Sequence, residues 1–280
     1  MLEKIFNITP TNKELLEKGL PKDLSESFRK ISVDKFEVPP NAILVLIPAF
    51  NEEGSIKDVI LRIPTIACGL KTQVLVINDG STDNTSSIAE AAGALVLDMP
   101  HNSGQGAALK TGYLFALQNK TRFVAVVDAD GQWDPSDLNE MITPLVKGDA
   151  DFTQGSRRLG TTDVQDRFRN LGVEFFTRLI SLATHTPVGD TSSGYRAYNC
   201  EVLEKVRLHQ RQYQSSEILI SAICSGARLY EHPVTMSVRT AGVSKKAANW
   251  KYGLLYLRAV LQTIIRDKYL VPLLKNHQNT

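Results

Sequence analysis

Two aspartates, Asp128 and Asp130, stand at the end of a short apolar run, residues 123–127. In an extended chain, residues two apart point to the same side. Two carboxylates without a nearby cation would repel and raise each other's pKa. A divalent hard cation removes this conflict, and Mg²⁺ commonly takes one or two carboxylates together with substrate phosphates and water. The pair therefore indicates a metal–phosphate site, unless Asp130 only caps the turn of residues 128–135.

Other polar turns follow the apolar runs that come earlier in the chain. The run at 42–50 leads through Pro48 to Glu52, and the run at 72–81 contains Asp79. Further strands are expected at 94–99, 122–128 and 149–157, and helices at 51–63, 82–93 and 104–118. Such alternation predicts the α/β class, with a mostly parallel sheet and helices on both faces. Because ligands bind beyond the carboxyl ends of parallel strands, the acidic turns should converge on one crevice.

Two flanking segments differ from this central part. Residues 1–38 are polar and helix-compatible, and two prolines close them, so we expect an N-terminal helical appendage before a catalytic domain at 39–246. Residues 247–280 predict a C-terminal amphipathic helix. Its apolar face would hold Trp250, Leu254, Leu257, Leu261, Ile264 and Ile265, opposite a narrower polar stripe of Lys251, Arg258, Gln262 and Arg266. Such a helix either lies in a membrane interface or packs on the catalytic domain or in a dimer.

Composition sets the broad class of the protein. The 280 residues carry a formal net charge of +2, which gives no bulk argument for nucleic-acid binding. The three cysteines form no CxxC pair and are expected to be reduced thiols of an intracellular protein. No run approaches eighteen apolar residues, so no transmembrane helix is expected. We therefore expect a cytoplasmic protein, with peripheral attachment to the cytoplasmic face of a membrane as the further option.

Seven short motifs occur together and in one order. They are IPAFNEE (47–53), NDGSTDNT (78–85), HNSGQGAALKTG (101–112), DADGQWDP (128–135), GSRR (155–158), DTSSGYRAY (190–198) and the tail at 213–246. Together they resemble the family-2 glycosyltransferases of the Rossmann-like GT-A fold, and more narrowly the dolichyl- or polyprenyl-phosphate hexosyltransferases. The resemblance covers about residues 42–246. Three positions depart from the family pattern: Phe50 replaces a tyrosine, Asn78 an aspartate and Trp133 a histidine.

The resemblance implies a role for each matching residue. The nucleoside of a nucleotide-diphosphate sugar would be held by Pro48, Phe50, Glu52 and Asp79. Mg²⁺ or Mn²⁺ on the diphosphate would be held by Asp128 and Asp130, with Gln132 in support. The phosphate and acceptor side would comprise Arg157, Arg169, Asp190, Ser193, Arg196, Arg239 and Lys245. The catalytic set would be Asp130, Gln132, Arg169 and Arg239, since charge that grows on the leaving diphosphate calls for a Lewis acid and fixed arginine donors.

The nature of the acceptor depends on whether the site needs a base. An attacking hydroxyl must lose its proton to a positioned general base. A phosphate monoester, with its second pKa near about 6, is already mostly dianionic at neutral pH. The plausible carboxylates on the acceptor side are Asp190 and Glu217, and Asp190 could instead bond the backbone of the turn that follows it.

We therefore expect an inverting transferase that moves a hexose to a polyprenyl phosphate. The alternative is the same fold acting on a hydroxyl of a soluble glycan, peptide or metabolite. The third hypothesis is a nucleotide-binding module without catalytic turnover. Against it argue the intact Asp128, Asp130 and Gln132. No nucleic-acid partner is expected, and the C-terminal helix leaves oligomer formation open.

Overall fold

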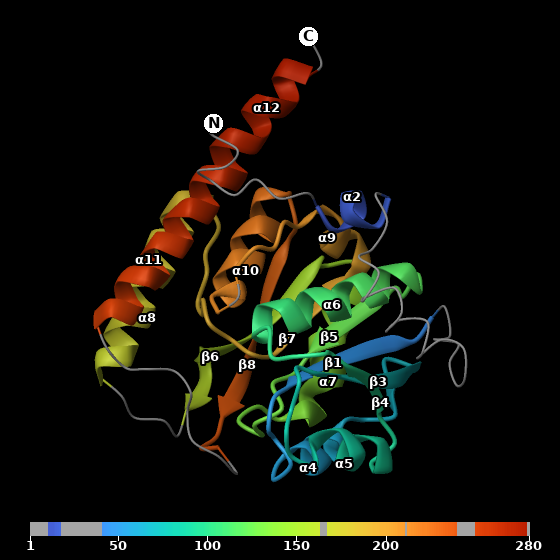
Figure 1. Cartoon of the computed structure of the whole chain (residues 1–280). Coiled ribbons are helices and arrows are strands. Elements are labelled where there is room, and N and C mark those ends of the chain that lie inside the picture. The colour runs from blue at the N-terminus through green and yellow to red at the C-terminus, as the bar shows by residue number, and fades with distance from the viewer. Residues whose placement is uncertain (1–10, 18–40, 163–166, 211, 240–249, 279–280) are drawn as a thin grey trace.

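The first half of the chain forms a parallel sheet. A computed structural model describes residues 11–17, 41–162, 167–210, 212–239 and 250–278 (Figure 1). Strands β1 (Ile43–Ala49), β3 (Leu70–Asn78), β4 (Leu95–Asp98) and β5 (Phe123–Val126) lie in the order β4-β3-β1-β5, all parallel. A two-residue strand, β2 (Ile66–Ala67), pairs antiparallel with the start of β3. These are the first four strands that the sequence predicted, and their carboxyl ends share one edge.

The second half adds a mixed section, of which the sequence predicted β6, at 149–157, but neither β7 nor β8. Strand β7 (Arg196–Asn199) runs antiparallel between β5 and β6 (Phe152–Thr162), and β8 (Leu229–Met236) pairs parallel with β6. The 3-10 turn η1 (Pro135–Asp137) follows the Asp128 turn. Only β2 and β7 run against the other strands in the part of the chain that the structure describes. The sheet is therefore mostly parallel, as expected, but not wholly so.

Helices cover both faces of the sheet (Figure 1). On one face lie α6 (Gln105–Gln118), α9 (Cys200–Lys205) and α10 (Gln214–Cys224), and on the other α4 (Ile56–Arg62), α5 (Thr85–Ala91) and α7 (Leu138–Lys147). Alternate residues of β1 enter the two cores: Leu44 packs with the α6 side, Ile43 and Val45 with the α4 side. This period of two explains why β1 reads as a continuous apolar run, because both of its faces are buried.

A long helix closes the chain. Helix α11 (Trp250–Ile264) continues through a π-helical segment, η2 (Ile265–Leu270), into α12 (Val271–Gln278), and it packs on α8 (Arg167–Thr184) and α10 (Figure 1). The expected packing on the catalytic domain is therefore present. No helix among the described residues is both long and apolar enough to cross a lipid bilayer.

The sequence predicted a single apolar face for this helix, but the apolar residues are divided between a buried side and an exposed side. Val260 and Ile264 are buried, whereas Leu254 and Leu261 are exposed. Arg266, expected on the outer polar stripe, is 2% exposed and forms ion pairs with Glu217 and Asp267. The π turn accounts for part of the difference, because its wider turn shifts the face that later residues present.

The N-terminal appendage is described only at residues 11–17, which contain helix α2 (Asn12–Glu17). Asn12 is fully buried. Its backbone N–H donates to the carbonyl of Val206 at 3.3 Å, and its Nδ2 donates to the carbonyl of Leu203 at 2.9 Å. This part of the appendage is thus anchored to α9 and is not an independent unit.

Candidate active site

The turns that follow β1 and β3 are hydrogen-bonded to each other. The N–H of Asn51 donates to Ser81 Oγ at 2.9 Å, and the N–H of Thr82 returns a bond to Asn51 Oδ1 at 2.8 Å. Asn51 takes a left-handed conformation, with φ of 54°, which asparagine tolerates better than most residues. Among the expected nucleoside residues, Pro48 is buried within β1, while Phe50 and Glu52 are half-buried at the strand end. Their contact with a nucleoside stays a prediction.

Asp79 anchors the loop that leads into α6. Its side chain is buried, and its carboxylate accepts the N–H of Ser103 at 2.7 Å and that of Gly104 at 2.8 Å. Gly104 has φ of 94°, a conformation that requires glycine at the start of this helix. Asp79 therefore has a positioning role that the sequence did not predict, and a bond to the nucleoside would have to coexist with these two bonds.

Asp128 and Asp130 lie beyond the end of β5, each with a different set of contacts. Asp128 accepts Gln105 Nε2 at 2.8 Å. Asp130 is 5% exposed, pairs with Arg239 Nη2 at 2.8 Å and accepts the N–H of Gln132 at 3.1 Å. Asp130 therefore does cap its own turn, as the alternative interpretation of the sequence held, and it also forms an ion pair with an arginine. The side chain of Gln132 donates to the carbonyl of Ser237 at 3.2 Å, which joins this turn to the segment that carries Arg239.

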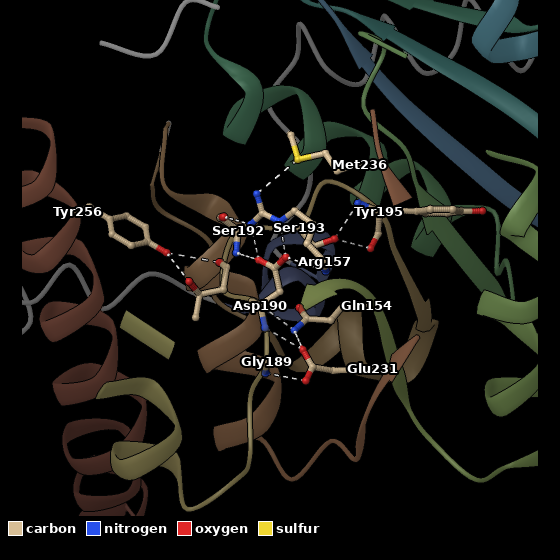
Figure 2. A network of polar contacts seen from close by, with 11 residues as sticks. Gln154, Arg157, Gly189, Asp190, Ser192, Ser193, Tyr195, Glu231, Met236 and Tyr256 are labelled. Carbon is tan, nitrogen blue, oxygen red and sulfur yellow. Dashed lines mark hydrogen bonds and ion pairs between the residues drawn. The ribbon is translucent and has the colours of Figure 1, made fainter. Parts of the chain in front are cut away.

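Arg157 and Asp190 form a buried bidentate ion pair (Figure 2). Arg157 Nε and Nη2 each lie 2.6 Å from a carboxylate oxygen of Asp190, and the two side chains are 10% and 1% exposed. Arg157 Nη2 also donates to Ser192 Oγ at 2.7 Å. Asp190 in turn accepts the N–H of Ser192 at 3.0 Å. This is the bond to the following turn that the sequence suggested as an alternative to a role as base. Arg157 was expected to face phosphate groups or to lie on a solvated face, and its carboxylate partner was not predicted.

Arg196 and Ser193 are deeply buried beside this pair. Ser193 Oγ donates to the carbonyl of Tyr195 at 3.1 Å and serves the local turn. Arg196, on β7, is 2% exposed, yet its Nε and Nη2 have no hydrogen-bond partner among the described residues. Burial raises the pKa of the neighbouring Tyr198 and Tyr256 phenols, and the charge of Arg196 acts in the opposite direction on both.

Glu217, the second carboxylate considered as a base, is also engaged. Its Oε1 lies 2.8 Å from Arg266 Nη1, and its Oε2 accepts the N–H groups of His209 and Gln210, each at 2.8 Å. It is 1% exposed. Glu217 therefore joins α10 to the C-terminal helix and is not free to accept a proton from a substrate.

Comparison with known proteins identifies the family. The family model described as "Glycosyl transferase family 2" matches residues 44–207, more than half of the chain and the part that holds most of this site. The chain belongs to glycosyl transferase family 2. It is a glycosyltransferase, and the geometry above is its candidate active site.

Relatives of this family-2 glycosyltransferase come from archaea and bacteria. An uncharacterised protein of Methanocaldococcus jannaschii is 34% identical over 71% of this chain and 82% of its own length. The polyprenol monophosphomannose synthase of Mycolicibacterium smegmatis is 29% identical, over 75% of this chain and 83% of that protein. A dodecaprenyl-phosphate galacturonate synthase of Rhizobium johnstonii is 25% identical, over 72% and 60%.

Solved structures show the same fold. The glucosyl-3-phosphoglycerate synthase of Mycobacterium tuberculosis, solved with Mn²⁺, UDP and phosphoglyceric acid, superposes with a TM-score of 0.62 at 21% identity. The match covers 88% of this chain and 82% of that one. The GT-A architecture expected of a family-2 glycosyltransferase is therefore confirmed.

Some residues of the glycosyltransferase site were missed by the sequence, and others lie outside the described residues. The structure adds Gln105 on Asp128 and Glu231 beneath Asp190. Both lie inside quoted motifs, but neither has a spacing that signals its contact. Lys245 lies outside the described residues. Arg169 is in the first turn of α8, and its side chain also lies outside them.

Proposed function

We propose that this enzyme moves a hexose from a nucleotide-diphosphate sugar to a polyprenyl phosphate, with inversion at the sugar carbon. Two of its relatives are named for polyprenyl-phosphate products. The observation that carries the proposal is Arg196, a buried guanidinium with two unpartnered nitrogens. Burying a charge without a counter-charge costs several kcal/mol in general, and a contact with the neutral phenol of Tyr198 does not supply one, so Arg196 is expected to have an anionic partner in the working complex. The dianionic head of a polyprenyl phosphate has the required charge.

The state of the two candidate bases supports the same acceptor. A hydroxyl acceptor needs a free carboxylate or a similar base within hydrogen-bond reach. Asp190 and Glu217 are each held by an arginine and by backbone N–H groups. A phosphate acceptor needs no base, because it carries its negative charge before it attacks. Asp190 is thus proposed to hold Arg157 in place, while Arg157 Nη1, the nitrogen that Asp190 does not bind, lies 3.5 Å from Met236 Sδ.

A divalent cation fits the residues present. Among the described residues no group of three or more histidines, cysteines or acids could hold a metal alone. Asp128 and Asp130 supply two carboxylates, a number that suits Mg²⁺ or Mn²⁺ when a diphosphate and water complete the shell. When bound there, the cation would neutralise the charge that grows on the leaving diphosphate. Gln105 orients Asp128, and Arg239 holds Asp130 and adds a fixed positive charge.

The C-terminal helix supplies a candidate membrane contact. Its outward stripe carries the exposed apolar residues Leu254, Leu261, Ile265, Tyr269 and Leu273, with the exposed Arg258 on the same face. Large apolar side chains gathered on one exposed face are typical of a surface that binds a partner or a lipid interface. Because a polyprenyl chain is itself held in a bilayer, we propose that this stripe rests on the membrane that carries the acceptor.

A direct assay tests the proposal. The protein is incubated with Mn²⁺ and a panel of nucleotide-sugars, together with one of three acceptors: polyprenyl phosphate, the matching polyprenol, or 3-phosphoglycerate. Mass spectrometry should detect a hexosyl phosphoprenol with the first acceptor alone. A product on polyprenol or phosphoglycerate, with polyprenyl phosphate unconsumed, would establish the hydroxyl-acceptor alternative.

A further inference from the structure

Glu231 of β8 holds the start of the 189–194 segment (Figure 2). Its Oε2 accepts the N–H of Gly189 at 2.6 Å, and its Oε1 accepts the N–H of Asp190 at 3.0 Å. Gln154 Nε2 donates to the same Oε1 at 2.8 Å and to the carbonyl of Asp190 at 2.7 Å. Burial raises the pKa of Glu231, and these three donors oppose that shift because they stabilise the carboxylate.

The other end of the segment presses on the candidate active site. Gly194 is so close to Asp128 that a Cβ at this glycine would lie 1.9 Å from Asp128 Oδ2, and 2.6 Å from Trp133 Nε1. Between the two ends of the segment, Asp190 forms the ion pair with Arg157. The segment therefore spans from Glu231 to Asp128 with little free space, and a shift at its start is transmitted to both the arginine and the aspartate.

We propose that Glu231 is a positioning residue for sugar transfer: its carboxylate fixes the 189–194 segment, which in turn places Arg157 and the wall against Asp128. A carboxylate suits this task because it offers acceptors only. A glutamine of the same shape would set an NH₂ group against a backbone N–H and leave a buried donor without a partner. The effect on rate rests on the proposed function, whereas the effect on Arg157 does not.

Two variants disturb the contact from opposite sides. Glu231→Gln removes the charge, and Gly189→Ala keeps it but adds a Cβ at 2.7 Å from Glu231 Oε2, so the carboxylate must move. Both should lower kcat about 100-fold, since small misplacements can cost that much. The double variant should be no worse than either single one. Gly253→Ala, where a Cβ meets nothing within 4 Å, is the matched control.

The NMR signal of the Arg157 Nε–Hε group provides a readout that does not depend on turnover. In the wild type this proton should be protected and strongly shifted by the bond to Asp190 Oδ2, and in both variants it should broaden or move. If wild-type transfer to polyprenyl phosphate fails, this signal alone tests the positioning. An unchanged signal in the folded variants overturns the proposal, as does a kcat within twofold of wild type. Loss of the folded state in both variants would make Glu231 purely structural and overturn it too.

Discussion

Arg196 is a buried cation whose effects on stability and on activity should have opposite signs. Arg196→Met keeps the length of the side chain and removes an unpaired charge from a 2% exposed position. Replacing buried charges by apolar groups of similar volume is often neutral or stabilising, by about 1–4 kcal/mol. We therefore expect the denaturant midpoint to stay or rise, while the KM for polyprenyl phosphate rises at least about tenfold, as expected when a charged hydrogen bond is lost. A variant that unfolds, or that keeps its KM, would contradict this role.

Asp130 should matter to the reaction more than to the fold. Asp130→Asn keeps the shape and its acceptor for the N–H of Gln132 but weakens the bond to Arg239. We expect transfer to fall at least about 100-fold, since stabilisation of leaving-group charge by a cation amounts to several kcal/mol. Calorimetry with Mn²⁺ and a nucleoside diphosphate should show weaker metal binding, and a chelator should abolish wild-type transfer. Asp58→Asn, at an exposed site on α4, is the control. Full activity of Asp130→Asn in chelator would refute the metal site.

Asp190 offers a test between a base and a support. Asp190→Asn weakens a buried ion pair and should lower the free energy of unfolding by about 3 kcal/mol. If Asp190 only supports Arg157, the remaining transfer should keep the wild-type pH profile, because no titrating base has been removed. Transfer to polyprenyl phosphate should be reduced, because Arg157 is held less firmly, but it should remain measurable. A folded variant that binds donor but has no activity, or that loses the acidic limb of the profile, would instead identify Asp190 as a base.

Asn78, which departs from the family's usual aspartate, has a local explanation. Its Nδ2 donates to Asp98 Oδ1 at 2.7 Å, across the paired ends of β3 and β4. Asn78→Asp would set two carboxylates against each other, and we expect a loss of about 1 kcal/mol in unfolding free energy, reduced by salt because Asp98 is exposed. Adding Asp98→Asn should restore the urea midpoint. If the double variant is no more stable than the single one, the repulsion is not the cause.

At the scale of elements, the C-terminal helix has two distinct sides, a buried one and an exposed one. Its inner side, with Val260, Ile264 and the Arg266–Glu217 pair, packs on the catalytic domain. Deleting the helix would expose this core, so an experiment could not separate loss of the proposed membrane contact from loss of packing. Its outer side, with Leu254, Leu261 and the later members of the stripe, can be changed alone. The two sides can therefore be tested separately.

Substitution of the outer stripe should release the protein from membranes. Leu261→Glu with Leu273→Glu places two charges on side chains that are 41% and 55% exposed, so the fold should tolerate them. In a flotation assay with anionic vesicles, the wild type should float and the double variant should remain at the bottom, with nucleotide-sugar binding unchanged. Gln262→Glu, on the same helix but off the stripe, is the control. A wild type that never floats would leave the stripe as a contact between protein chains.

At the scale of the molecule, the sequence predicted strands that neighbouring residues determine, and it missed contacts between residues far apart in the chain. Strands β1, β3, β4 and β5 were found because buried parallel strands are apolar runs with turns at their ends. Strand β7 was missed because it has only four residues and begins with the charged Arg196, so it forms no apolar run. The Arg157–Asp190 pair joins residues 33 positions apart, and no periodicity reports such a distance. Glu217 was placed near the acceptor because nothing in the sequence signals the Arg266 that occupies it.

The place of β7 in the sheet has a consequence for the order in which the protein can fold. β5 presents its second edge to β7, whose residues follow about seventy positions later, and among the described strands β6 reaches β5 and the strands before it only through β7. Until residue 199 has been synthesised, β5 is an open edge, of the kind that favours pairing with other chains. Contacts this distant in sequence are slow to close. The half-sheet that ends at Asp128 can therefore condense early, while the half that carries Arg157, Asp190 and Glu231 can dock only afterwards. We therefore expect the wall of the candidate site to be among the last parts of the enzyme to form.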